Sequence, residues 1–86
     1  MLKVLKFGAP WCGPCKMLNP VLDELKEEMT DVEFESVDVD VDQDKAIEFG
    51  VMSVPTVFFI KDGETVDKFV GYLPKEVIKE KIEAHL

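Results

Sequence analysis

The sequence WCGPC at residues 11–15 decides how this chain is interpreted, because it holds both cysteines of the 86 residues. A strand-like run, residues 2–7, precedes it, and residues 8–10, Gly-Ala-Pro, end the strand before a helical pattern begins. A cysteine at a helix N-terminus forms thiolate readily, because unpaired N–H groups and the helix dipole stabilise negative charge. We therefore predict a reversible dithiol–disulfide pair in which Cys12 is the nucleophile.

The second cysteine completes a redox cycle that needs no cofactor. Cys15 lies one helical turn after Cys12, close enough to attack a mixed disulfide at Cys12 and release the reduced substrate. A purely structural disulfide is a weaker interpretation, because closing so short a loop restricts the unfolded chain little.

The two cysteines also have the spacing of zinc ligands. A structural zinc usually needs four Cys or His ligands, and the only other candidate in the chain is His85. A metal or iron–sulfur cluster shared by two chains stays open. We interpret His85 as a solvated helix-end residue that interacts with the helix dipole.

Strand and helix patterns alternate along the chain and place the cysteines at one end of a sheet. The helix after the first strand requires a crossover, so the first two strands should be parallel. Asp62-Gly63 is typical of a two-residue hairpin, so the last two strands should be antiparallel. We expect a mixed four-stranded sheet with helices on both sides, built from strand 2–7, helix 13–29, strand 33–39, a helix capped by Asp42 and ending near residue 50, strand 56–60, strand 65–70 and a helix opened by Pro74.

Apolar spacing predicts which side chains face the core. In the helix over 13–29 these are Leu18, Val21, Leu22, Leu25 and Met29. In the strand near 33–39 and the residues after it they are Val37, Val39 and Val41, and in the last helix Val77, Ile78, Ile82 and Leu86.

Together with the cysteine motif, several short motifs make the chain resemble the thioredoxin family. They are Lys16, Pro20, Val54-Pro55-Thr56, the turn at residues 61–64, and Gly71. The resemblance implies one α/β domain over residues 1–86, a thioredoxin fold of order βαβαββα that lacks the N-terminal strand and helix of longer members. It also implies a protein-disulfide reductase with no cofactor, whose partners are disulfide-containing proteins and an electron donor, thioredoxin reductase or glutathione.

The resemblance further implies a substrate groove around the cysteines. Its central feature is a cis Val54–Pro55 peptide bond, which leaves the Val54 backbone free to pair with an extended substrate. The alternative is that Pro55 only starts an edge strand. The residues implied in substrate binding are Trp11, Gly13, Pro14, Val54, Pro55, Gly71 and Tyr72.

Lys6 departs from the family pattern, which has a buried aspartate six residues before the first cysteine. The lysine usual on the second strand aligns with Ser36. One hypothesis is that Lys6 is partly buried beneath the cysteines, where it stabilises thiolate or, when neutral, accepts a proton from Cys15. The alternative is that only its stem packs, while its ammonium extends into water.

Composition and charge narrow the possible partners. The formal net charge is −8, from 10 basic and 18 acidic side chains, which argues against nucleic acid. No apolar run approaches the roughly 20 residues of a membrane span, and no secretory signal is apparent, so we expect a cytoplasmic location. We also expect a monomer. The acidic run at residues 38–44 is a poor calcium loop, since counting from Asp38 puts Gln43 where glycine belongs and Phe49 where glutamate belongs.

Two other functions stay open at this point. Gly13-Pro14 between the cysteines resembles thioredoxins, whereas the short length resembles glutaredoxins, so a glutathione-coupled oxidoreductase is one alternative. A binding module whose cysteines are incidental is the other.

Overall fold

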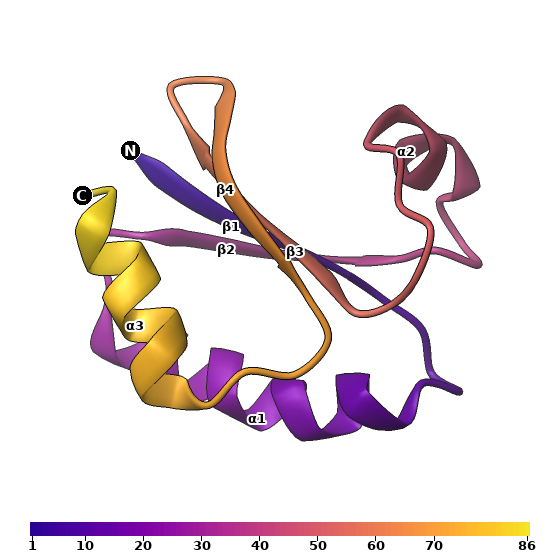
Figure 1. Ribbon diagram of the computed structural model, residues 1–86, viewed down its shortest axis with the longest axis horizontal. Coiled ribbons are helices and arrows are strands. Elements are labelled where there is room, and N and C mark those ends of the chain that lie inside the picture. The colour runs from indigo at the N-terminus through magenta and orange to yellow at the C-terminus, as the bar shows by residue number, and fades with distance from the viewer.

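Seven elements follow one another along the chain in the computed structural model, which describes all of residues 1–86 (Figure 1). Their order is that predicted from the sequence, and most boundaries agree within two residues. The elements are β1 (Leu2–Gly8), α1 (Gly13–Glu28), β2 (Glu33–Asp38), α2 (Gln43–Glu48), β3 (Thr56–Lys61), β4 (Glu64–Val70) and α3 (Lys75–Ala84).

The four strands form one mixed sheet in the order β2-β1-β3-β4. β1 pairs parallel with β2 and antiparallel with β3, and β3 pairs antiparallel with β4. The β3–β4 hairpin turns at Asp62 and Gly63, whose φ angles of 53° and 83° are both positive, as a tight two-residue turn with the twist of the sheet requires. Both pairing predictions are confirmed.

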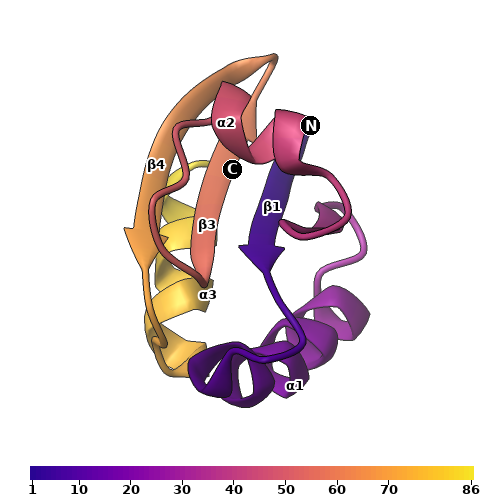
Figure 2. The ribbon, with the colours of Figure 1, turned by 90° about the vertical axis from the view of Figure 1, so that its right-hand side faces the viewer.

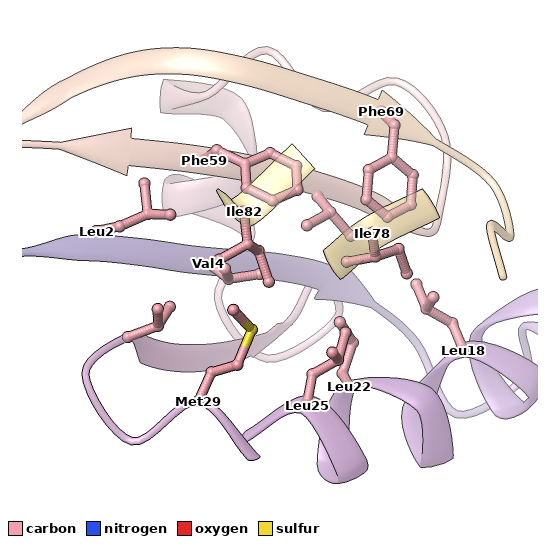
Figure 3. Packing of buried hydrophobic residues seen from close by; sticks show 12 residues of the cluster. Leu2, Val4, Leu18, Leu22, Leu25, Met29, Phe59, Phe69, Ile78 and Ile82 are labelled. Atoms are coloured by element: carbon pink, nitrogen blue, oxygen red, sulfur yellow. The ribbon is translucent and has the colours of Figure 1, made fainter. Parts of the chain in front are cut away.

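Helices cover both faces of this sheet. α1 and α3 pack side by side against one face, where Leu2 and Val4 of β1 enter a cluster of twelve buried residues (Figures 1 and 3). α2 covers the other face near Leu5 and Phe7 (Figure 2). There Phe7 contacts Phe49 and Phe58, with ring centroids 5.3 and 5.6 Å away. No helix of the chain is both long and apolar enough to cross a bilayer.

The prediction of a core position is wrong for three residues. Val41 is 82% exposed, because β2 ends at Asp38 and the chain then turns, with the Val41 N–H donating to the Asp38 carbonyl. Val77 lies at the margin of the α3 core face, and Leu86 follows the helix end and is exposed. The buried face of α3 is formed by Ile78 and Ile82 alone.

His85 is also placed differently from the prediction of a solvated residue. It is half-buried at the C-terminal end of α3, and its Nε2 lies 3.3 Å from Oδ2 of Asp67 on β4. Lys81 Nζ lies 3.5 Å from the same carboxylate. These contacts attach α3 to the edge strand β4. The helical pattern of the sequence does not show that Asp67 is the partner.

We predict that Ile78→Ala lowers the free energy of unfolding by about 2–5 kcal/mol, because it leaves a cavity between α3 and the sheet. Ile78 is fully buried, whereas its neighbour Val77 is 36% exposed on the same helix. Val77→Ala is therefore the matched control and should change stability by less than about 0.5 kcal/mol. Urea unfolding measures both, and equal losses in the two variants would contradict this packing.

Candidate active site

The two cysteines lie where β1 ends and α1 begins, joined by a disulfide with Cα atoms 5.3 Å apart. Cys12 is the N-cap of α1, with extended backbone at φ −86° and ψ 114°, and Pro14 occupies the first turn. The Cys15 backbone N–H donates to Cys12 Sγ over 3.1 Å. A sulfur in this position receives the N–H groups that the first helical turn leaves unpaired. Negative charge on Cys12 is therefore stabilised by the fold itself.

A cis Val54–Pro55 peptide bond lies beside the cysteines, as the family resemblance implied. Val54 packs against the small cluster of Ala9, Cys12 and Cys15. Neither the N–H nor the C=O of Val54 takes part in a backbone hydrogen bond. The segment next to the disulfide thus presents an unused backbone donor and acceptor.

Gly71 joins the end of β4 to this proline. Its N–H donates to the Pro55 carbonyl over 2.8 Å, and its φ of 89° is a conformation that glycine adopts without steric cost. The predicted groove residues Pro55 and Gly71 are therefore brought together, with Tyr72 following and partly exposed.

Trp11 and Gly13-Pro14 form the exposed side of the motif. Trp11 is 67% exposed, yet its indole Nε1–H donates to Asp40 Oδ2 over 2.8 Å. Gly13 has open space where a side chain would stand. In the sequence, Asp40 has no role beyond membership of an acidic run that makes a poor calcium loop. No group of three or more His, Cys, Asp or Glu residues lies close enough together to hold a metal. The parallel pairing of Gly8 with Asp38 is the signal that brings this loop to the motif.

Lys6 lies beneath the disulfide and is buried, with 8% of its surface exposed. Its Nζ donates to Asn19 Oδ1, and no carboxylate lies within ion-pair distance. Burial lowers the pKa of Lys6 below its usual value, and the negative charge of Asp23 partly opposes this effect.

Gly8 separates the lysine from the second cysteine. A methyl group placed there would stand 3.2 Å from Cys15 Sγ and 3.7 Å from Lys6 Nζ. The two groups share a pocket of about 250 Å³, lined by Lys6, Gly8, Ala9, Pro10, Cys15, Asn19, Ser36, Val37 and Asp38.

Asn19 was missed in the sequence, although it lies four residues after Cys15 and so on the same face of α1. Ser36 is the register partner of Lys6 on β2, which agrees with its alignment to the family's usual lysine position. The pair of opposite charges expected at these two positions in the family is therefore a lysine and a serine here.

Comparison with known proteins identifies the family. The thioredoxin family model matches residues 1–84. The thioredoxin of Bacillus subtilis is 52% identical over 81 residues, which cover 93% of this chain and 78% of that protein. The thioredoxin of Staphylococcus haemolyticus is 46% identical over 86 residues, covering 99% of this chain and 83% of that protein.

Solved structures agree with the sequence comparison. The X-ray structure of Fasciola hepatica thioredoxin superposes with a TM-score of 0.93 at 41% identity, covering 99% of this chain and 81% of that one. A mutant thioredoxin from Halobacterium salinarum gives 0.90 at 41% identity, covering 96% of this chain and 73% of that one. With the Cys12–Cys15 redox pair at the start of α1 and the βαβαββα fold of these relatives, the chain belongs to the thioredoxin family and is a thiol–disulfide oxidoreductase with protein-disulfide reductase activity.

Proposed function

We propose that the chain reduces disulfides in other proteins, with Cys12 as the attacking thiolate and Cys15 as the resolving thiol. The observation that carries these roles is the position of Cys12 as N-cap, where its sulfur already accepts the Cys15 N–H. A thiolate there is stabilised by a hydrogen bond to charge and by the helix dipole. Cys15 lies inside the helix, with its sulfur directed toward Gly8 and Lys6.

The reaction proceeds by two exchanges at sulfur. The Cys12 thiolate attacks one sulfur of the substrate disulfide, a Cys12–substrate bond forms, and the other substrate sulfur leaves as a thiolate that takes a proton from water. Cys15 then loses its proton and attacks Cys12 Sγ. The Cys12–Cys15 bond forms, the mixed disulfide breaks, and the second substrate thiolate is released and protonated. Two electrons have moved from the cysteine pair to the substrate.

The free backbone of Val54 supports a protein substrate over a small one. An extended chain beside the disulfide can pair with this N–H and C=O as an added strand does. Trp11, Gly13 and Pro14 then bound one side of the substrate, and Pro55, Gly71 and Tyr72 the other. Trp11 is fixed in place by its hydrogen bond to Asp40, so this contact is organised before the substrate arrives.

For the electron donor we propose a thioredoxin reductase, with glutathione as the alternative. The relatives that support this choice are named thioredoxins and cover nearly the whole chain. The monomeric state and the cytoplasmic location expected from the sequence remain predictions.

We predict that Cys15→Ser traps substrates on Cys12, because attack proceeds while resolution is lost. Mass spectrometry after mixing with a disulfide-containing protein such as insulin should show a mixed disulfide at Cys12. The matched control, Cys12→Ser, should form no comparable adduct. Faster adduct formation at Cys15 in that control would overturn the assigned roles, and a large preference for oxidised glutathione over the protein would favour the glutathione-coupled alternative.

We also predict that Tyr72→Ala lowers kcat/KM for a protein disulfide by about fivefold or more, because truncating a tyrosine that contributes to an interface costs about 1 kcal/mol or more. A small aromatic disulfide, which does not extend past Cys12, should react at an unchanged rate. Val66→Ala is the control, because Val66 is similarly exposed and lies toward the other end of β4. Equal losses on both substrates would show that Tyr72 supports the fold and does not bind substrate.

A further inference from the structure

Lys6 is the only charged residue among the buried residues of this protein. Its ammonium has one acceptor, Asn19 Oδ1, and no carboxylate within ion-pair distance. An ammonium can donate three hydrogen bonds, so two donors remain for other groups in the pocket. Burial of an unpaired charge destabilises a fold, and a hydrophobic side chain in this position would pack at lower cost. The fold thus retains a charge that its core does not need.

The position of Lys6 relates it to Cys15 and not to the exposed face of the motif. Lys6 and Cys15 Sγ both contact the space above Gly8 and line the same pocket. Asn19, one turn after Cys15 on α1, fixes the ammonium beside this space. When the disulfide is closed, both sulfurs are neutral and the lysine has no anion to pair with. A thiolate at Cys15 would supply one.

Lys6 also lines a second pocket of about 190 Å³ on its other side, together with Asp23, Lys26 and Glu35. Each pocket is larger than the space one water molecule needs, and polar side chains form part of the wall of both. Water in the pocket beside Cys15 can therefore accept the proton that the Cys15 thiol releases. The ammonium therefore need not accept that proton itself.

We propose that the Lys6 ammonium stabilises the Cys15 thiolate in the resolving step, which makes Lys6 a charge partner for the second cysteine. This inference rests on the roles proposed above for Cys12 and Cys15. Once Cys12 is bound to substrate, the Cys15 thiol gives its proton to water in the pocket, and the thiolate lies opposite the ammonium. The thiolate then attacks Cys12 Sγ, the substrate sulfur leaves as a thiolate and is protonated by water, and Lys6 keeps its own proton throughout.

None of the other charged groups around Lys6 is placed to stabilise a Cys15 thiolate. From α1, Asp23 faces it and favours its charged form, while Lys26 lines the far pocket. From β2, Glu35 is already paired with Lys3 and Lys45. Asp38, also on β2, accepts the Asp40 backbone N–H. Lys6 is the one cation that shares a pocket with the Cys15 sulfur.

The direct test is the pKa of the Cys15 thiol, measured by NMR of the labelled cysteine in a Cys12→Ser background. Lys6→Met should raise this pKa by about one unit or more, the usual effect of removing a neighbouring opposite charge. Lys3→Met is the matched control, since it removes the same charge from the opposite face of β1 and should leave the pKa unchanged. An unchanged pKa in Lys6→Met would overturn the proposal. Should Lys6→Met fail to fold, Lys6→Gln is measured in its place under the same criteria.

Single-turnover kinetics of the two-cysteine protein separate this proposal from the assigned cysteine roles. At neutral pH, Lys6→Met should slow release of the mixed disulfide by about threefold for each unit by which the Cys15 pKa rises, because the loss of about nine-tenths of the thiolate is partly offset by the greater nucleophilicity of a more basic thiolate. Formation of the mixed disulfide at Cys12 should change much less. Equal slowing of both steps, or of neither, would overturn the role of Lys6. Failure of Cys15→Ser to trap substrate would instead overturn the cysteine roles.

A stability measurement gives an independent check on the resting state. Lys6→Met should raise the urea midpoint of the oxidised protein at pH 7, because it removes an unpaired buried charge. The difference in urea midpoint between Lys6→Met and the unmutated protein should narrow as pH rises toward 10.5. Because the pKa of Lys6 is lowered in the folded protein, the unfolded chain binds more protons in this pH range, and the unmutated protein gains stability as pH rises. Lower stability of Lys6→Met at every pH would show a structural role and would overturn the claim that the charge is unpaired at rest.

Discussion

The burial of β1 on both of its faces is the constraint on which the rest of the structure depends. Alternate residues of this strand supply two separate cores, Leu2 and Val4 beneath α1 and α3, and Leu5 and Phe7 beneath α2. β1 is also paired along both edges, with β2 and with β3. Its register is therefore fixed, since a shift by one residue would exchange the two faces. The same register places Lys6 on the side of α1, where its side chain is buried next to Cys15 and Asn19.

The site forms because three separate segments meet at the end of this strand. The turn after Gly8 begins α1 at Cys12, the loop after β2 brings Asp40 to Trp11, and the loop before β3 brings Val54 and Pro55 to the disulfide. Each segment follows a strand of the same sheet or precedes one, so strand pairing alone sets their relative positions. A cysteine at a helix N-terminus is thus placed beside a free backbone edge.

The sequence predicted the elements and the cysteine chemistry because both depend on local patterns. Helical spacing located Leu18, Leu22 and Leu25, and Asp62-Gly63 located the hairpin. The errors concern residues that lie beyond the end of an element or at the margin of its buried face. Val41 alternates correctly with Val37 but lies beyond the last paired residue of β2, so the alternation no longer reports burial.

The side-chain partners missed in the sequence lie far from each other along the chain. Asp40 reaches Trp11 across 29 residues, and His85 reaches Asp67 across 18. Asn19 was accessible from helical spacing, but only after Lys6 was known to be buried near Cys15. The cis bond before Pro55 came from the family resemblance, because a proline after valine does not by itself distinguish the two isomers.

A lysine at position 6 favours ionisation of the Cys15 thiol in a different way from a carboxylate. A carboxylate can accept the thiol proton but repels the thiolate that results, whereas an ammonium attracts the thiolate and leaves the proton to water. A lower thiol pKa also makes each thiolate a weaker nucleophile, so the gain is largest when the unperturbed thiol is mostly protonated at the working pH. The buried ammonium is least favourable with the disulfide closed and acquires a partner once Cys15 ionises. The buried charge thus destabilises the oxidised protein, and it is stabilised in the mixed disulfide once Cys15 is ionised and the substrate is about to be released.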